Sequence, residues 1–120
     1  MTPFGQKVRY WRERKGRTQK QQAEFLGVST AYVSALENGA RGQPSAVFVD
    51  QICVWLDLIW DDAEELKHLA ALSHPKPTLD VRNQHAKAVE LANLLAKNIH
   101  RLTAEDCQTL IDDLKARVGP

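Results

Sequence analysis

The chain has 120 residues, of which 43% are hydrophobic and 26% are charged, and its formal net charge is +1 at pH 7. This length provides one modest core, or a small domain with an appended segment. No apolar run approaches the roughly 20 residues of a membrane span, and residues 1–6 lack a signal-peptide pattern. Cys53 and Cys107 have no Cys-x-x-Cys spacing, so we expect two reduced core thiols in a cytoplasmic protein without a membrane anchor.

The charge is unevenly distributed along the chain. Residues 1–41 carry eight basic and three acidic side chains, a net charge of +5, whereas residues 42–120 carry eight basic and twelve acidic side chains, a net charge of −4. Such asymmetry indicates that the first third of the chain binds a polyanion. The alternative is that these charged side chains simply lie on solvated helix faces.

A first helix is predicted up to about Lys15. Thr2 is a suitable N-cap, and Pro3 suits the first helical position, where a missing N–H costs nothing. Gly16 is expected to end the helix. Its apolar face comprises Phe4, Val8 and Trp11.

Residues 18–38 predict two short helices joined by a tight turn. Thr18 and Ser29 are N-cap residues for the two helices, and Gly27 supplies the positive φ that a helix end often requires. The pattern A-x3-G-x5-V-x2-L is formed by Ala23, Gly27, Val33 and Leu36. A small residue, a turn glycine and two branched residues at this spacing are typical of a DNA-binding helix-turn-helix.

With its flanking residues, this stretch resembles the Cro/repressor-type helix-turn-helix family, also called XRE-type, of bacterial and phage regulators. The resemblance covers residues 4–16, 18–19, 23–29, 32–39 and 44–45. It implies a five-helix, all-α domain that binds double-stranded DNA, with a recognition helix from about Thr30 to Asn38.

The resemblance also implies which side chains face base edges in the major groove. They are Thr30, Ala31, Ser34 and Ala35, with Tyr32 beside them. None is an Arg, Lys, Asn or Gln, the residues that make bidentate contacts with bases. Thymine-methyl contacts and hydroxyl hydrogen bonds remain available, so specificity is expected to depend on DNA shape and on phosphate register.

A second set of residues is expected at the phosphate backbone. It comprises Arg17, Gln19, Lys20, Ser29, Asn38, Arg41 and Gln43. Amides at a helix N-terminus favour anions, which suits the start of the second helix. For the glycine-containing turn at residues 39–44, a turn without a ligand is the alternative to a phosphate contact by Arg41. A nucleotide-binding loop is not indicated, because no strand and no Gly-Lys-Ser/Thr motif are present.

The family resemblance implies a structural ion pair between Arg12 in the first helix and Glu37 in the third. The planar guanidinium suits this role because it can hold a carboxylate with two hydrogen bonds. Gln22 departs from the family pattern, which usually has a large apolar residue at this position. Either Trp11 fills the space or the amide finds a partner, and of the possible placements we expect a partly exposed side chain.

A fourth helix is predicted after its N-cap, Ser45. Its apolar stripe comprises Phe48, Val49, Ile52, Cys53 and Leu56. A fifth helix follows over about residues 61–72, with an apolar side of Leu66, Leu69, Ala70 and Leu72. Its first residues, DDAEE, are acidic enough to suggest a metal site or acid–base chemistry, but stabilisation of a helix N-terminus by negative charge explains them better. The four histidines lack metal-ligand spacing.

Residues 73–80 are predicted to be a linker, and residues 81–120 a hairpin of two amphipathic helices. The first helix has the apolar face Val81, Ala88, Val89, Ala92, Leu95, Ala96 and Ile99, and the second has Cys107, Leu110, Ile111, Leu114 and Val118. Thr103 and Asp106 have the spacing of a capping box for the second helix. A hairpin of two such helices cannot bury its apolar faces alone, and a second copy of the chain is the simplest partner.

These observations predict a sequence-specific regulator, in particular a repressor, that binds a two-fold operator on double-stranded DNA as a homodimer. It would be cytoplasmic, and associated with the nucleoid when bound to DNA. No catalytic constellation, cofactor motif or metal site is recognisable, so an enzyme is not expected. The alternative is an antitoxin or adaptor with the same fold, in which the hairpin holds a protein partner and DNA binding is secondary.

Overall fold

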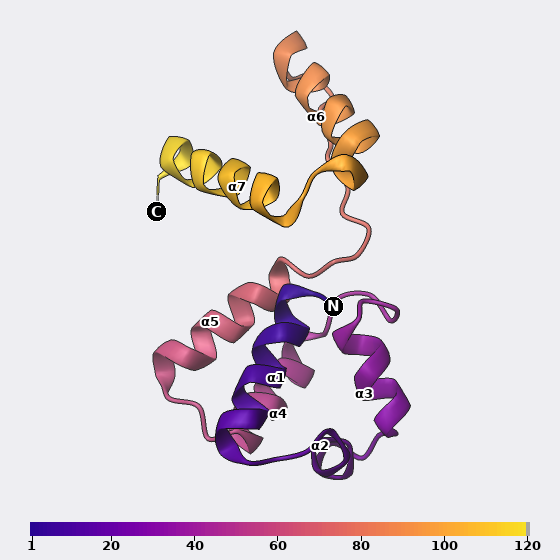
Figure 1. Cartoon of the computed structure of the whole chain (residues 1–120), viewed down its shortest axis with the longest axis vertical. Helices are drawn as coiled ribbons and strands as arrows, with labels where there is room; N and C mark the ends of the chain where they lie inside the picture. Colours follow the sequence, from indigo (N-terminus) through magenta and orange to yellow (C-terminus); the bar gives the residue numbers. More distant parts are fainter. Residues whose placement is uncertain (120) are drawn as a thin grey trace. The chain divides into compact units, whose positions relative to one another are not determined.

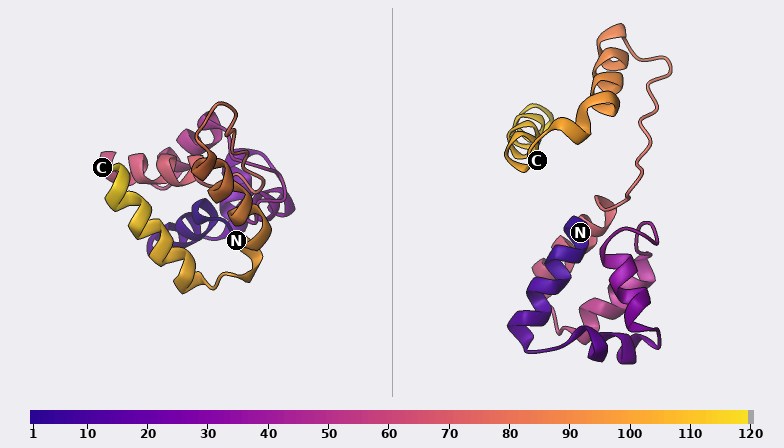
Figure 2. Two further views of the ribbon diagram at one scale, coloured as in Figure 1. Left: turned by 90° about the horizontal axis from the view of Figure 1, so that it is seen from above. Right: turned by 45° about the vertical axis from the view of Figure 1, so that its right-hand side comes forward.

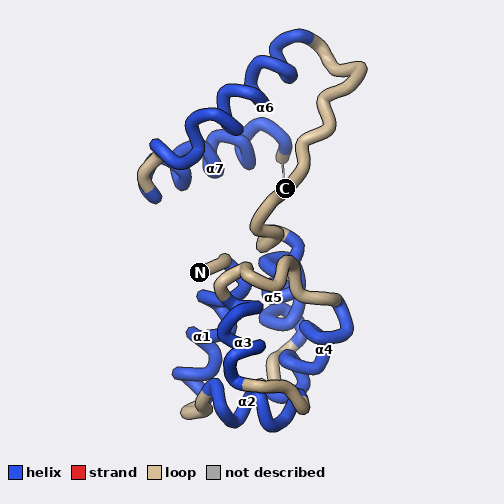
Figure 3. Tube along the Cα trace, turned by 90° about the vertical axis from the view of Figure 1, so that its right-hand side faces the viewer, coloured by secondary structure: helices blue, strands red, loops and turns tan. Residues whose placement is uncertain are grey.

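The computed structural model describes residues 1–119 and divides the chain into two compact units. The first unit is Met1–Pro77, and the second begins at Thr78. All regular elements of the described chain are helices (Figures 1 and 3). The predicted all-α class is therefore confirmed. Pro120, the last residue of the predicted hairpin, lies outside the described residues.

The first unit contains the five predicted helices: α1 (Pro3–Lys15), α2 (Gln19–Leu26), α3 (Thr30–Glu37), α4 (Ala46–Trp55) and α5 (Trp60–Ala71). Each of the first four begins after a Thr or Ser whose hydroxyl accepts a hydrogen bond from a backbone N–H in the first turn. These caps are Thr2, Thr18, Ser29 and Ser45. Gly16 and Gly27 end α1 and α2 with φ angles of 65° and 71°, a conformation that glycine adopts without steric cost. The predicted caps and glycine stops are confirmed.

The core of the first unit lies between α1, α4 and α5, which run close together in Figure 1. It consists of Phe4, Val8, Val49, Ile52, Cys53, Leu56, Leu66 and Ala70, with Trp11, Leu26 and Phe48 packed against it. The predicted stripe of the fourth helix is thus confirmed. Leu72 was expected on the apolar side of the fifth helix, which is wrong: α5 ends one residue earlier, and Leu72 is 59% exposed.

The start of α1 is tied to the end of α5 by Ser73. The Ser73 hydroxyl donates to the Leu69 carbonyl at 2.6 Å and accepts the N–H of Phe4 at 3.0 Å, and the residue is buried. These bonds satisfy backbone groups at two helix ends that would otherwise lack partners. Ser73 therefore belongs to the first unit, and the segment without helix between α5 and α6 is visible in Figure 2.

The second unit contains α6 (Ala86–Asn98), the short 3-10 turn η1 (Ile99–Arg101) and α7 (Ala104–Val118). Thr103 and Asp106 form the predicted capping box, with bonds of 3.0 Å in both directions. Val81 was expected in the first of these helices, which is wrong, because α6 begins after its N-cap His85. Within residues 78–119 no residue is fully buried.

Candidate nucleic-acid interface

The site begins with the packing of α2 against α3, which hold the turn between them in one geometry. Ala23 and Val33 are buried at 3% and 1% exposure, and the N–H of Val28 donates to the Ala23 carbonyl at 3.0 Å. A small side chain at residue 23 lets the two helices approach closely. The result is a helix-turn-helix in which α3 lies at the surface of the first unit, on the side nearest the viewer in Figure 3.

The outer face of α3 carries small side chains. Thr30 and Ala31 are exposed, whereas Ser34 and Ala35 are half-buried. The Ser29 hydroxyl accepts the N–H of Tyr32 at 3.0 Å and so orients the first turn of the helix. A face of methyl and hydroxyl groups lets the helix backbone come close to a ligand, and offers contacts to thymine methyls and to base edges.

Tyr32, which was predicted beside the base-facing residues, has a ring that is engaged by neighbouring side chains. Its ring packs edge-on against the Phe48 ring, with centroids 6.1 Å apart at 71°, and the Arg41 guanidinium lies over it at 5.5 Å. The ring is thus held between α4 and the turn that follows α3.

Several of the predicted phosphate ligands have side chains that are already engaged within the first unit, among them Arg17 and Gln43. Arg17 donates to the Trp55 carbonyl and to the Asp57 carboxylate, the latter at 3.3 Å, and its guanidinium stacks over the Trp55 ring at 5.3 Å. Gln43 donates from its side-chain amide to the Ala70 carbonyl at 3.1 Å, which ties the turn after α3 to α5.

Three other predicted phosphate ligands, Lys20, Asn38 and Arg41, are exposed. Asn38 donates from its side-chain amide to the Ser34 carbonyl at 3.0 Å, at the end of α3. Gln19 is half-buried at the first position of α2, and its side-chain amide donates to the Glu37 carboxylate at 3.4 Å. These residues place polar groups and two cations on both sides of α3.

A buried polar cluster joins α1, α2 and α3 beneath this face. One guanidinium nitrogen of Arg12 donates to Glu37 Oε1 and to Gln22 Oε1, both at 2.6 Å. Arg12, Gln22 and Glu37 are 6%, 1% and 2% exposed. The expectation that Gln22 is partly exposed is wrong, because its amide oxygen is a second acceptor for the buried guanidinium.

Gly5 is a structural residue that sequence reasoning did not single out. A Cβ at this position would lie 2.3 Å from the Glu37 carbonyl oxygen. Thr2 donates to the same oxygen from its backbone N–H and from its hydroxyl, each at 3.0 Å. The end of α3 therefore rests directly on the first turn of α1, and the only signal for this in the sequence is the glycine itself.

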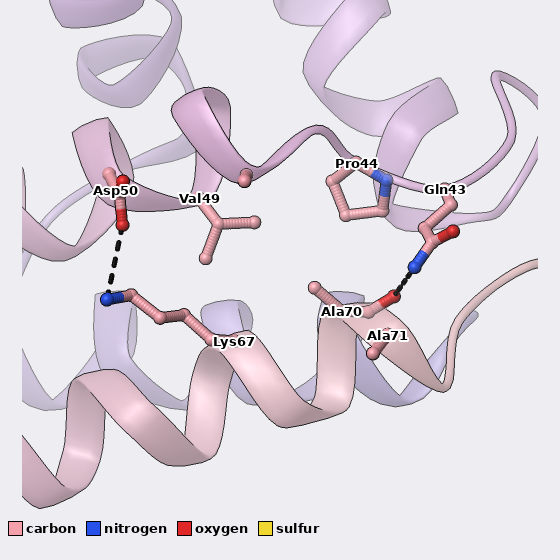
Figure 4. A pocket seen from close by; sticks show the side chains of 8 residues that line it. Gln43, Pro44, Val49, Asp50, Lys67, Ala70 and Ala71 are labelled. Carbon is pink, nitrogen blue, oxygen red and sulfur yellow. Dashed lines mark hydrogen bonds and ion pairs between the residues drawn. The ribbon is translucent and has the colours of Figure 1, made fainter.

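The polar groups that line one cavity of the first unit are paired with each other. This cavity of about 310 Å³ lies between α4 and α5 (Figure 4). At one side Lys67 pairs with Asp50 at 3.4 Å, which raises the pKa of Lys67, and at the other Gln43 bonds Ala70. No group of three metal-binding side chains occurs within residues 1–119. None of the described helices has the length and apolar content needed to cross a bilayer.

The Cys53 thiol is buried beside the core and lines a second cavity, which is bounded by Trp60 and Lys67. Burial raises the pKa of this thiol, an effect that the Lys67 charge partly opposes. Because its side chain packs among the core residues, Cys53 acts as a small hydrophobic residue.

The chain is similar in sequence to a known protein family. The helix-turn-helix domain family matches residues 3–69. The HTH-type transcriptional repressor RghR of Bacillus subtilis is 30% identical over 98 residues, which cover 78% of this chain and 73% of RghR. RghRB of the same organism, an uncharacterized HTH-type transcriptional regulator, is 34% identical over 62 residues, 52% of this chain and 45% of its own length.

A third relative is the HTH-type transcriptional regulator SinR of Bacillus subtilis, 30% identical over 65 residues that cover 54% of this chain and 59% of SinR. The chain thus spans less than half of RghRB and less than two thirds of SinR. No solved structure matches it significantly. All three relatives are described as HTH-type transcriptional regulators or repressors. The match over residues 3–69 and the similarity to RghR show that the chain belongs to the XRE-type helix-turn-helix family of transcriptional regulators.

Proposed function

We propose that this protein is a sequence-specific, double-stranded DNA-binding regulator that acts as a repressor on a two-fold operator in the cytoplasm. The observation that carries the proposal is the open outer face of α3, where small side chains are flanked by the exposed cations Lys20 and Arg41. The net charge of +5 over residues 1–41 also favours binding to the DNA backbone. The name of RghR supports repression as the outcome.

In this proposal the protein contacts the DNA phosphate backbone through Lys20, Asn38 and Arg41, together with the backbone amides at the start of α2. Gln19 and Ser29 lie at the helix starts and complete this set, while Arg17 and Gln43 serve mainly to hold the first unit together. The base edges are met by Thr30, Ala31, Ser34 and Ala35. Since these side chains make few directional contacts, much of the specificity comes from the phosphate register and from DNA shape.

The second unit supports assembly as a homodimer. Many of its large apolar side chains are exposed: Val89, Leu91, Leu94 and Ile99 from α6 and η1, and Leu110, Ile111, Leu114 and Val118 from α7. A patch of this kind on a short hairpin is typical of a protein interface. A single recognition helix reads only a few base pairs, so two copies, with recognition helices about 34 Å apart, provide the selectivity that a genome requires.

The same exposed hairpin favours one alternative, an antitoxin or adaptor in which it holds a different protein and DNA binding is secondary. The two functions differ in what the purified protein does alone. A homodimeric regulator dimerises and shifts its operator without help. An adaptor requires its partner for a stable assembly.

The test is a pull-down of genomic fragments at defined salt, followed by sequencing. The wild-type protein is compared with Ala31→Glu, which adds a negative charge at an exposed position of α3. Gln51→Glu, which adds the same charge at an exposed position of α4, is the matched control. We expect the wild type and Gln51→Glu to enrich the same two-fold sequence, and Ala31→Glu to lose it. Equal enrichment by all three proteins, or none by the wild type, would contradict the proposal.

A further inference from the structure

The pair formed by Tyr32 and Arg41 links the recognition helix to the turn that follows it. The Arg41 guanidinium carbon lies 5.5 Å from the centroid of the Tyr32 ring. Arg41 is exposed, and none of the ion pairs within residues 1–119 includes it. Its charge is therefore stacked on a ring but is not neutralised by a carboxylate.

Both members of this pair are fixed by further contacts within the first unit. The Phe48 ring supports Tyr32 edge-on from α4. The turn that carries Arg41 is closed by hydrogen bonds from the N–H of Ala40 to the Ala35 carbonyl at 2.9 Å, and from the N–H of Gly42 to the Gly39 carbonyl at 3.2 Å. The guanidinium thus has a fixed backbone on one side and a fixed ring on the other.

Such an arrangement matters for a phosphate ligand. A free arginine side chain on a turn samples many rotamers and loses this freedom when it binds an anion. A guanidinium that is already stacked loses less, and its outward N–H groups remain available because stacking occupies only its flat face. The ring is also withdrawn from the base edges, since it is packed against Phe48 and covered by Arg41.

We propose that Tyr32 is a positioning residue that holds the Arg41 guanidinium ready to bind a phosphate of the DNA backbone beside the recognition helix. The inference rests on the proposed DNA-binding function and assigns Tyr32 an indirect part in it. The ring face carries the effect, so the hydroxyl is dispensable. A cation–π contact at an exposed site corresponds to about a two- to five-fold change in an equilibrium constant.

The experiment measures affinity for an operator duplex over a range of salt concentrations, using the full chain. Arg41→Ala should lower the slope of log affinity against log salt by about one, which is the signature of one lost phosphate contact. Tyr32→Leu should weaken binding by about two- to five-fold. Tyr32→Phe should behave as the wild type, because it keeps the ring.

The double variant, Tyr32→Leu with Arg41→Ala, distinguishes positioning of Arg41 by Tyr32 from a general structural effect of losing the ring. In the Arg41→Ala background, Tyr32→Leu should cause no further loss, because the residue that it positions is gone. An equal loss in both backgrounds would overturn the inference. The matched control is Tyr10→Leu in α1, where Arg14 stacks over the Tyr10 ring at 5.4 Å, away from α3, and we expect unchanged affinity from it.

A second series keeps the shape of the ring and so avoids any loss of folding. Phenylalanine with increasing fluorine substitution, incorporated at residue 32, progressively weakens the negative face of the ring. Affinity should fall stepwise with fluorine content in wild-type Arg41 and stay constant in Arg41→Ala. Affinity independent of fluorine content would also overturn the inference. If the wild-type protein binds no duplex at all, the proposed function itself fails, which is a separate result.

Discussion

At the scale of single residues, the cluster of Arg12, Gln22 and Glu37 shows how a polar group is accommodated under the helix-turn-helix. A buried charge is tolerated only when it is paired and its hydrogen-bonding groups are satisfied. Here one guanidinium is shared by a carboxylate and an amide that come from different helices. The cluster therefore fixes α1, α2 and α3 relative to one another.

Substitutions in this cluster should lower the free energy of unfolding by very different amounts. Arg12→Ala leaves the Glu37 carboxylate buried without its cation, and we expect it to lower the free energy of unfolding by about 3–5 kcal/mol. Gln22→Leu removes only one of two acceptors and adds apolar contact, so its expected cost is under about 1 kcal/mol. Urea unfolding followed by tryptophan fluorescence measures this, because all three tryptophans lie between residues 11 and 60. An equal loss of unfolding free energy in the two variants would show that the Gln22 amide stabilises the fold as much as the ion pair does.

At the scale of elements, α1 and the end of α3 approach each other closely at Gly5. The Glu37 carbonyl accepts two bonds from Thr2 and leaves no room for a Cβ at residue 5. Because α3 carries the proposed base contacts, its angle to the rest of the domain depends on this contact.

Gly5→Ala should therefore destabilise the domain, although alanine is the better helix former. The added methyl forces α1 away from the α3 backbone, and overpacking of this kind costs about 1–3 kcal/mol. Thermal melting of the variant should show a lower midpoint than the wild type. Gln6→Ala, at the neighbouring exposed position, is the control and should change stability by less than about 0.5 kcal/mol. A midpoint for Gly5→Ala at or above that of the wild type would show that the helices can move apart freely.

At the scale of the whole molecule, the two units have different kinds of stability. The first has its own core and its own polar cluster. The second has capped helices with no fully buried residue between 78 and 119. Its helices gain little from packing on each other, so a partner surface is the natural source of their stability.

Truncation after Pro77 should accordingly leave a folded, monomeric protein that binds its operator more weakly. Light scattering reports the mass, tryptophan fluorescence the fold, and gel shift the affinity. Leu114→Asp in the full chain places a charge on the exposed stripe of α7 and should have the same effect without a deletion. If the truncated protein still dimerises and binds normally, the hairpin serves another task, such as holding a partner protein.

The boundaries of α1, α2 and α3 and the helix-turn-helix pattern were predictable from the sequence, because caps, glycine stops and apolar spacing are local features of the chain. The end of α5 and the start of α6 were not predicted correctly. Thr18, Gly27 and Ser29 specify α2, the turn and the start of α3 without help from distant residues. The roles of individual polar side chains depended instead on contacts across 9 to 38 residues of sequence: Arg41 on Tyr32, Arg12 on Gln22 and Arg17 on Trp55. A side chain that looks free in its own helix can be engaged by another element, and only the packed structure shows which ones remain for a ligand.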